Sequence, residues 1–420
     1  MIIGQAIIGG LAVILLALTF SPFGTAALYL FARPLVQPYA ALGCTFAGVI
    51  PAAGVLSLIV CASALFSRLW RARYIIFTGQ LLPLYLLLYF CTISLLHTPS
   101  HAISLAHALK IFTGIALFIL ILNAVKSEAD IDRLLWIYLL SAVIPMIYGY
   151  YQFVTATGHA WKGPYYAGRR IDSLLMEYNA YGEFLCITIC AALMLFFRQK
   201  TKKKRLIVGI LFISLLINLL LAMNRGSWIC LLFALMAAAL FYRKKVSLPL
   251  LLGLSLTALL LASPVIYNRF MELTLQSEWG GRNTYLGRIS AWKILMPVIL
   301  NHPFTGNGIG AIQLITEREL GRTIVPHNDY VRLLAEGGIF ALLSYIWFHG
   351  ANLYLYIVKY RYQAWQMNYP MLVAALYFVT LSFFQNIIQN VVVFPMFTGL
   401  LAMAFKANSI AYRGVDNAGA

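Results

Sequence analysis

Long apolar runs separated by short polar connections dominate this sequence. Twelve runs approach or exceed the roughly 20 residues that a membrane-spanning helix needs, near residues 3–20, 40–65, 75–96, 106–125, 133–154, 178–197, 206–222, 226–242, 247–266, 333–356, 369–387 and 390–406. Hydrophobic residues make up 62% of the chain and charged residues only 10%, against about 25% charged in a soluble domain. We therefore expect an all-α polytopic membrane protein with about twelve transmembrane helices.

The first residues need separate treatment in this count. The run 3–20 has no basic segment before it and no small-residue cleavage site, so we expect a retained first span and not a removed signal peptide. A shorter apolar run at 23–31 is bracketed by prolines. Because it is too short to span a bilayer, it is a candidate re-entrant segment.

Lysine and arginine are distributed on alternate loops. The loops concerned contain Arg68, Arg71, Arg73; Lys126, Arg133; Arg198, Lys200, Lys202, Lys203, Lys204, Arg205; Arg243, Lys244, Lys245; Lys359, Arg361; and Lys406, Arg413. The positive-inside rule then predicts that both termini are cytoplasmic. The same rule accounts for the net charge of +18. Nucleic acid is not expected as a partner, because no basic stripe is interleaved with stacking aromatic residues.

Two outer loops are long. One covers residues 155–177, and the other covers 267–332, between the ninth and tenth predicted spans. Connections of the second length usually have a function. We expect three regions: helices 1–9 with the short loop (1–266), a large, partly helical loop subdomain (267–332), and helices 10–12 with a cytoplasmic tail (333–420).

One arginine is expected at the membrane boundary. Arg225 lies in the nearly loopless outer hairpin between the predicted spans 206–222 and 226–242. A charge at that depth is costly, so the side chain either snorkels to the headgroups or has a function. The planar guanidinium suits phosphate oxygens. Arg225 is therefore a candidate ligand for a diphosphate at headgroup level.

The large loop contains a helix signal and then a turn signal. Within 286–300, apolar residues recur at Ile289, Trp292, Met296 and Ile299, which predicts an amphipathic helix on the membrane surface or against the bundle, with Arg288 one turn before Trp292. The following segment, 301–310 (NHPFTGNGIG), is rich in glycine. Without a strand–loop–helix context we favour a tight turn over an anion-binding loop.

The end of the large loop contains a candidate base. Asn328 or Asp329 is expected to cap the helix that follows. His327 would then lie beside the positive helix end, which favours the neutral imidazole that a general base requires. The alternative is a structural histidine. Histidines 97, 101, 107 and 159 are expected on outer loops, and none offers a metal-site arrangement, so no metal and no cofactor are expected.

Together these motifs resemble the bacterial O-antigen ligase and polymerase superfamily. The residues that carry the resemblance are Arg225-Gly226-Ser227, Arg288, Trp292, His302-Pro303, Gly306, Gly308, His327-Asn328-Asp329-Tyr330 and Glu336-Gly337-Gly338. Their order, spacing and place on a long outer loop agree with that family. The match is concentrated between residues 165 and 345, and the flanking helices agree mainly in number and topology.

The resemblance implies a metal-independent glycosyltransferase of the bacterial inner membrane. A glycan would pass from undecaprenyl diphosphate to a hydroxyl of lipid A-core on the periplasmic face. Arg225 and Arg288 would hold the diphosphate and stabilise the leaving charge, and His327 would be the base. The further substrate-binding candidates are Arg170, Asn179, Trp292 and Tyr330. We expect Arg225, Arg288 and His327 to line one cavity that opens to the outer leaflet.

Three activities within this superfamily stay open. A ligase transfers the finished polymer, a polymerase joins repeat units, and a protein-directed enzyme glycosylates serine or threonine. One dominant outer loop favours the ligase, since polymerases often have two comparable ones, and no extra C-terminal domain follows Ala404. A transporter of lipid-linked glycans is the alternative of another class. The absence of an internal repeat and of mid-span ionisable residues other than Glu183 and His349 disfavours it.

Overall fold

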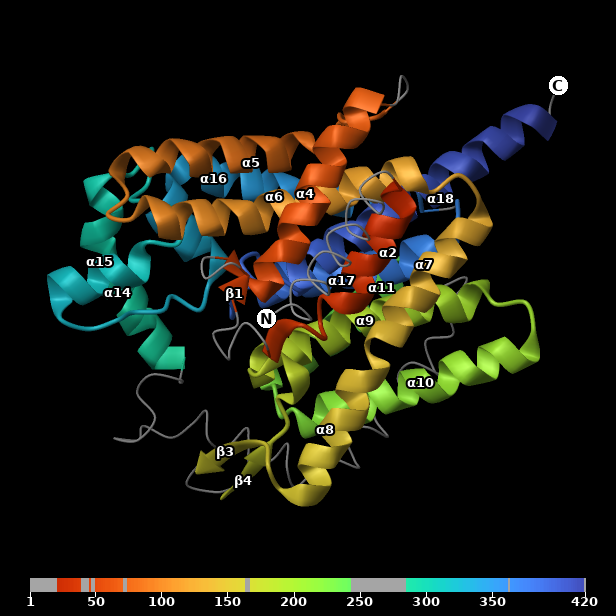
Figure 1. The fold of residues 1–420 in the computed structure, drawn as a ribbon, viewed down its shortest axis with the longest axis horizontal. Helices are drawn as coiled ribbons and strands as arrows, with labels where there is room; N and C mark the ends of the chain where they lie inside the picture. Colours follow the sequence, from red (N-terminus) through yellow and green to blue (C-terminus); the bar gives the residue numbers. More distant parts are fainter. Residues whose placement is uncertain are drawn as a thin grey trace, which may run out of the picture.

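The apolar runs form a bundle of helices in a computed structural model, which describes residues 21–38, 45–46, 50–70, 74–162, 167–242, 285–361 and 363–418 (Figure 1). The α-helices are α2 (Pro22–Ala32), α4 (Ala52–Trp70), α5 (Leu82–Ile93), α6 (His101–Ala124), α7 (Glu128–Ser141), α8 (Val143–Thr155), α9 (Tyr178–Arg198), α10 (Lys202–Leu221), α11 (Arg225–Phe241), α14 (Tyr285–Asn301), α15 (Ile312–Leu320), α16 (Asp329–Tyr354), α17 (Trp365–Leu381) and α18 (Val393–Ala418). Short 3₁₀ turns η1 (Ser94–His97) and η2 (Ser173–Leu175) and a π-helical turn η3 (Leu355–Lys359) complete the helical elements.

Six of these helical segments are long and apolar enough to cross a membrane. They are His101–Ala124, Glu128–Thr155, Tyr178–Arg198, Lys202–Leu221, Asp329–Lys359 and Val393–Tyr412. Shorter apolar helices cover Gly54–Ser67, Leu82–His97 and Arg225–Phe241, inside or beside three further predicted spans. The expectation of an all-α polytopic membrane protein is confirmed. The number twelve stays a prediction, because the runs 3–20 and 247–266 lie outside the described residues.

The candidate re-entrant run is the short helix α2. Its 11 residues are about half of what a span needs. Ser21 caps the helix by accepting a hydrogen bond from the backbone N–H of Gly24, and Tyr29 and Leu30 are buried. The helix packs on α4, α6 and α7. Its C-terminal end brings Arg33 into the interior of the protein, where that side chain is only 2% exposed.

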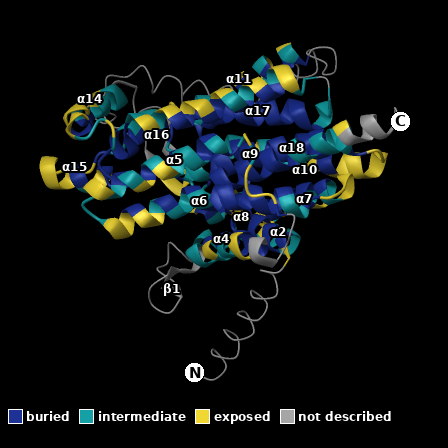
Figure 2. Cartoon of the chain, turned by 90° about the horizontal axis from the view of Figure 1, so that it is seen from above, coloured by how far each residue is buried: buried dark blue, intermediate teal, exposed yellow. Residues whose placement is uncertain are grey.

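Burial separates the centre of the bundle from its lipid-facing rim. Helix α9 lies in the interior, together with α17 and α18 (Figure 2). Helix α10, by contrast, is mostly uncovered. The exposed face of α10 is apolar, and includes Leu206, Ile210 and Ile213. An uncovered apolar face suits contact with lipid chains. The exposure pattern therefore agrees with a helix at the edge of a membrane bundle.

The large loop packs against the bundle through α14 and α15. Both lie at one end of the molecule beside α5 and α16 (Figure 1), and Leu295, Val298 and Ile299 form a core with residues of α15 and α16. The helix predicted at 286–300 is thus present, but its predicted apolar face is wrong at Met296, which is 49% exposed. The buried face of α14 is the one that packs on α16, and it carries Leu295 and Val298. The predicted subdomain boundaries at 267 and 332 stay predictions.

The short outer loop contains a β-hairpin that the sequence analysis did not anticipate. Strand β3 (His159–Lys162) pairs antiparallel with β4 (Ala167–Arg170), and His159 is opposite Arg170. A second pair, β1 (Thr45–Phe46) and β2 (Ile50–Pro51), precedes α4. The register of β3 and β4 places Arg170 next to the start of α9, where its side chain is 2% exposed.

A glycine-rich turn packs closely against an interruption in helix α16. We call residues 302–310, together with the segment 336–338 that they contact, the clasp. Gly338 has φ 78° and ψ −179°, which interrupts the helix. A Cβ on Gly338 would lie 2.2 Å from the Phe304 carbonyl oxygen, and one on Gly306 would lie 2.2 Å from the Glu336 carbonyl oxygen. Only glycine permits this backbone contact.

Candidate active site

A cavity of about 780 Å³, most of whose lining residues are polar or charged, lies among α2, α4, α6, α9, α16 and the segment before α18. Its lining includes His327 and Asn179, two of the residues singled out in the sequence. Arg225, Arg288, Arg170, Trp292 and Tyr330 are not among the residues that line it. The expectation that Arg225, Arg288 and His327 line one cavity is therefore met only by His327.

His327 is fixed by its neighbours along the chain. Asn328, one of the two predicted caps, caps α16 with its side-chain oxygen accepting from the Val331 N–H at 3.0 Å. The indole N–H of Trp292 donates to the Pro326 carbonyl at 2.8 Å. His327 itself has φ 48°, in the left-handed region. Helix α14 thus holds the residue before the histidine, and the cap holds the residue after it.

The surroundings of His327 favour its neutral form. Burial lowers the pKa of His327 below its ordinary value, and the positive charge of Arg288 lowers it further, against a hydrogen bond with Gln385 that raises it. Arg288 therefore lies close enough to act on the imidazole. A neutral imidazole keeps a free lone pair near pH 7, which a proton acceptor needs.

Asp329 ties the His327 segment to the segment before α18. Its Oδ2 accepts from the backbone N–H groups of Ile387 (3.0 Å) and Ile388 (3.1 Å) and from the hydroxyl of Ser382 (3.2 Å). This fully buried carboxylate holds two stretches of chain together beside the cavity. Gln385 belongs to the second stretch and lines the cavity with His327.

Arg170 and Arg288 meet at the start of α9. The guanidinium of Arg170 lies over the ring of Tyr178, 4.5 Å from its centroid. Arg288 also interacts electrostatically with Tyr178. The next residue, Asn179, donates from its amide to Glu177 at 2.7 Å and lines the cavity. The hairpin, α14 and α9 thus bring these predicted residues to one region.

Arg225 reaches the same region through its neighbour in sequence. Asn224 caps α11 by accepting from the Ser227 N–H at 3.1 Å, and Arg225 is the first residue of that helix. The side-chain amide of Asn224 donates to the carbonyl of Asn179 at 3.3 Å. The Arg-Gly-Ser element is therefore anchored to the start of α9.

Tyr330 has a different environment. Its hydroxyl donates to the Val379 carbonyl at 3.1 Å, and its ring centroid lies 4.4 Å from that of Phe383. These contacts hold the side chain against α17 and the residues that follow it. The predicted substrate-binding role of Tyr330 stays a prediction.

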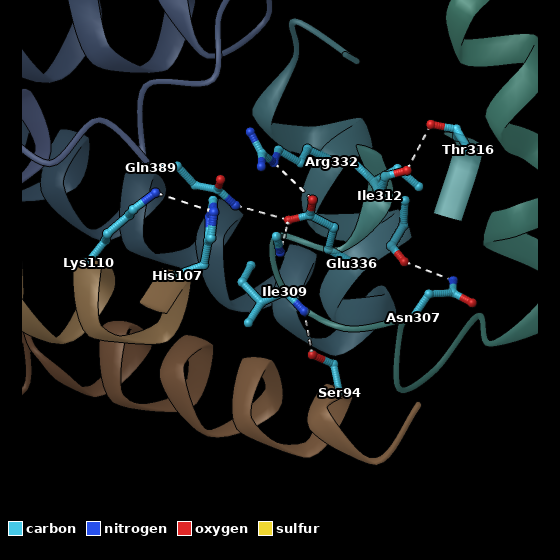
Figure 3. A network of polar contacts seen from close by, with 12 residues as sticks. Ser94, His107, Lys110, Asn307, Ile309, Ile312, Thr316, Arg332, Glu336 and Gln389 are labelled. Atoms are coloured by element: carbon cyan, nitrogen blue, oxygen red, sulfur yellow. Dashed lines mark hydrogen bonds and ion pairs between the residues drawn. The ribbon is translucent and has the colours of Figure 1, made fainter. Parts of the chain in front are cut away.

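Three cations on the cavity were not predicted from the sequence. Arg33, Lys110 and Arg332 line it together with His107, and we call these four residues the cation wall. Lys110 donates to His107 at 3.3 Å, and Arg332 pairs with Glu336 at 3.1 Å (Figure 3). His107 belongs to α6, so its expected place on an outer loop is wrong. Lys110 also lies well inside the span His101–Ala124, so Glu183 and His349 are not the only ionisable residues near the middle of a span. A lysine inside an apolar run is the signal that identifies Lys110.

The backbone N–H groups of the clasp are hydrogen-bonded within the protein. The backbone N–H groups of Asn307 and Gly308 donate to the carbonyls of Ala335 and Glu336, at 3.1 and 3.0 Å. Those of Ile309 and Gly310 donate to Ser94 Oγ at 3.0 Å and Glu336 Oε2 at 2.8 Å. The prediction of a tight turn is confirmed, since these N–H groups are already taken.

No group of three or more potential metal ligands is found among the described residues. His97 and His302 stack with ring centroids 3.9 Å apart, without a third partner of that kind in this part of the chain. Parallel stacked imidazoles cannot direct both nitrogen lone pairs at one ion. The expectation of a metal-independent reaction stays a prediction.

Comparison with known proteins gives two matches. Residues 210–346, which contain Arg225, Arg288 and His327, match the family described as O-Antigen ligase. The Teichuronic acid biosynthesis protein TuaE of Bacillus subtilis (strain 168) is 26% identical over 299 residues, which cover 65% of this chain and 59% of that protein. The chain therefore spans less than two thirds of this relative's length.

Proposed function

We propose that this chain, a member of the O-antigen ligase and polymerase superfamily, is a membrane glycosyltransferase of the ligase type. It transfers a glycan from undecaprenyl diphosphate to a sugar hydroxyl of lipid A-core, on the periplasmic face of the bacterial inner membrane, without a metal or cofactor. The observation that carries the proposal is His327, half-buried on the cavity, with Arg288 near enough to act on its imidazole.

The proposed reaction is a single displacement at the anomeric carbon of the donor glycan. The acceptor hydroxyl gives its proton to His327 as its oxygen bonds to that carbon. The bond between the carbon and the diphosphate oxygen breaks, and undecaprenyl diphosphate leaves with the electron pair. The lowered pKa of His327 supports this role, because the imidazole is already unprotonated at neutral pH.

Arg288 and Arg225 are the proposed ligands of the diphosphate. Charge develops on the leaving group as the bond breaks, and fixed guanidinium groups stabilise it without reorganisation. The anchoring of Asn224 to Asn179 and the electrostatic interactions of Arg288 with Tyr178 and His327 support a common region for these groups. Arg170, over Tyr178, is proposed to contact the same substrate.

Polymerisation is the second candidate function. The name of the Bacillus subtilis relative refers to teichuronic acid biosynthesis and not to lipid A-core. In a polymerase the acceptor hydroxyl would belong to a second lipid-linked glycan. The same base and the same diphosphate ligands would serve, so the two candidates differ only in the acceptor.

A reconstituted transfer assay tests the proposal. Purified protein in liposomes would receive undecaprenyl-diphosphate-linked polymer and lipid A-core, with chelator present. We expect polymer on lipid A-core, and a rate roughly 10²- to 10⁴-fold lower for His327→Ala at unchanged thermal stability. His101→Ala is the matched control, since His101 is exposed at the start of α6.

Other results of the transfer assay would indicate a different activity or a different base. Lengthening of the lipid-linked glycan without transfer to lipid A-core would identify a polymerase. Movement of the lipid-linked glycan across the bilayer, without transfer and equally fast in His327→Ala, would identify a transporter. Full ligase activity in His327→Ala would remove the proposed base.

A further inference from the structure

The cation wall contains two cations that make no ion pair in the described part of the chain. Arg33, Lys110 and Arg332 contribute three cations, and Glu336 balances one of them through its contact with Arg332. Glu177 and Glu183 also line the cavity, but in the described structure their carboxylates accept hydrogen bonds from Asn179 and Asn390 and form no ion pair with the wall. Arg33 and Arg332 both act electrostatically on Lys110. Neither Arg33 nor Lys110 pairs with an acid among the described residues. Gathering like charges in a poorly solvated place is unfavourable, so an anion is the expected occupant.

Hydrogen-bonding groups on this wall are also left over. Nε of Arg33 is buried and has no hydrogen-bond partner, although Nη1 donates to Gln37 at 2.9 Å. Arg332 uses Nε for Glu336, and its terminal nitrogens, which are not among the buried unpaired atoms, make no hydrogen bond in the described part of the chain. Buried polar groups normally find partners. These groups therefore point to a ligand with several acceptor oxygens.

The rest of the lining fits a carbohydrate. Seven of the residues around the cavity are asparagine or glutamine. The side-chain oxygens of Asn386 and Gln389 are buried and accept no hydrogen bond in the described structure. Amide side chains offer both donors and acceptors, as sugar hydroxyls do. A volume of about 780 Å³ falls within the usual range for ligand sites.

We propose that the cation wall binds an oxyanion, carboxylate or phosphoryl, carried by a sugar of the glycan substrate. The inference rests on the proposed function and adds a substrate class to it, an acidic glycan. Glu336 positions Arg332 and is itself held by the Gly310 N–H at 2.8 Å and Gln389 at 2.9 Å (Figure 3). Gly310, at φ 78°, leaves room for the His107 ring, which a Cβ there would meet at 2.5 Å.

The position of the wall favours the glycan over the donor diphosphate as the source of the oxyanion. The wall shares the cavity with His327, the proposed base, and with the amide side chains. Arg288 and Arg225, the proposed diphosphate ligands, lie outside the cavity lining. A substrate held by both sets would place its diphosphate at the arginines and its acidic sugar at the wall.

Binding to the full-length protein in detergent tests this without turnover. The probes are a neutral hexose tetrasaccharide, one matched counterpart with a hexuronic acid, one with a phosphorylated hexose, and undecaprenyl diphosphate. The variants are Arg33→Gln and Lys110→Met, with Lys203→Gln, exposed on α10, as the control. We expect tighter binding of an acidic tetrasaccharide than of the neutral one. Each cavity variant should lose roughly ten- to a hundredfold of that affinity.

The melting temperature of the ligand-free protein distinguishes a binding role from a structural one. A purely structural wall would give variants with a lower melting temperature. Removing one of several like charges should raise the melting temperature of Lys110→Met, by about 2 °C. The acidic probe that binds more tightly shows whether the wall recognises a carboxylate or a phosphoryl group.

Equal binding of acidic and neutral probes would overturn the proposal. So would a loss confined to undecaprenyl diphosphate, which would assign the wall to the donor. A lower melting temperature with unchanged probe affinity would make the wall structural. Failure of the transfer assay leaves these binding results intact, so the two proposals fail separately.

Discussion

The clasp and the cation wall are neighbouring polar regions, joined by the ion pair between Glu336 of the clasp and Arg332 of the wall, and they differ in how fully their groups are paired. In the clasp, the backbone N–H groups of residues 307–310 each reach an acceptor of the protein. On the wall, Arg33 keeps an unpaired Nε and Lys110 has no acid partner among the described residues. Complete pairing stabilises a fold. Incomplete pairing beside a cavity indicates a ligand.

The comparison also assigns different roles to motifs of similar appearance. The glycines of 306–310 resemble an anion-binding loop in sequence, yet their N–H groups are occupied within the protein. Lys110 and Arg33 belong to no recognisable motif, yet they face the cavity. Anion binding is therefore expected on the wall and not at the glycines. Four predictions test this division.

The largest effect is expected in the clasp. Gly338→Ala places a Cβ 2.2 Å from the Phe304 carbonyl oxygen, at a backbone conformation that is essentially restricted to glycine. We expect a loss of more than about 4 kcal/mol in the free energy of unfolding, or no folded protein. Gly350→Ala is the control, because a Cβ there meets nothing within 4 Å. Equal thermal melts of the two variants would show that the clasp is dispensable.

The second effect concerns the ion pair that joins the two regions. Glu336→Gln leaves Arg332 without its buried counter-charge, and we expect a cost of about 3 kcal/mol. Removing both charges in Glu336→Gln/Arg332→Met should recover much of this loss, since no unpaired charge then remains. A double-mutant cycle by chemical denaturation measures the coupling. Additive losses would show that the two side chains act independently.

A smaller effect is expected at the cap beside the base. Asn328→Ala removes the acceptor for the Val331 N–H, at a cost of about 1 kcal/mol in stability. Asn328→Ser should restore most of it, because serine is also a good cap. Thermal melting of the three proteins checks this. A stable alanine variant would mean that Asp329 and Trp292 fix the segment alone.

The smallest effect is on the pH profile. The pKa of His327 lies below its ordinary value of 6.5, so transfer should still exceed half of its maximum at pH 6.5 and fall below half only at lower pH. The unfolded chain binds this proton at a higher pH than the folded chain does. The stability contribution is therefore present above pH 6.5 and is lost as the pH falls through that region. An acid limb of kcat/KM centred above pH 6.5 would contradict the assignment.

Local signals were sufficient for several parts of this protein. The apolar runs predicted helices, and the sequence before α16 predicted the Asn328 cap. The same reasoning reached the wrong face of α14 at Met296, because packing on α16 and not helical spacing decided which residues are buried. The β3–β4 hairpin was missed, since four-residue strands in a polar loop have little periodicity.

What the sequence alone determined is the class of the protein and the candidates that adjoin helix ends, His327 and Arg225 among them. These follow from hydrophobicity, charge and capping, which act over a few residues. Only the tertiary structure brought Arg33, Lys110 and Arg332 to one cavity, from helices far apart in the chain. The role we propose for these three residues depends on which of their charges and hydrogen-bonding groups are paired within the protein. Packing between helices decides that pairing. In the sequence, a lysine within an apolar run is only a charge that is costly to place in a membrane span. In the structure it lies beside other cations on a cavity, where it can bind a ligand.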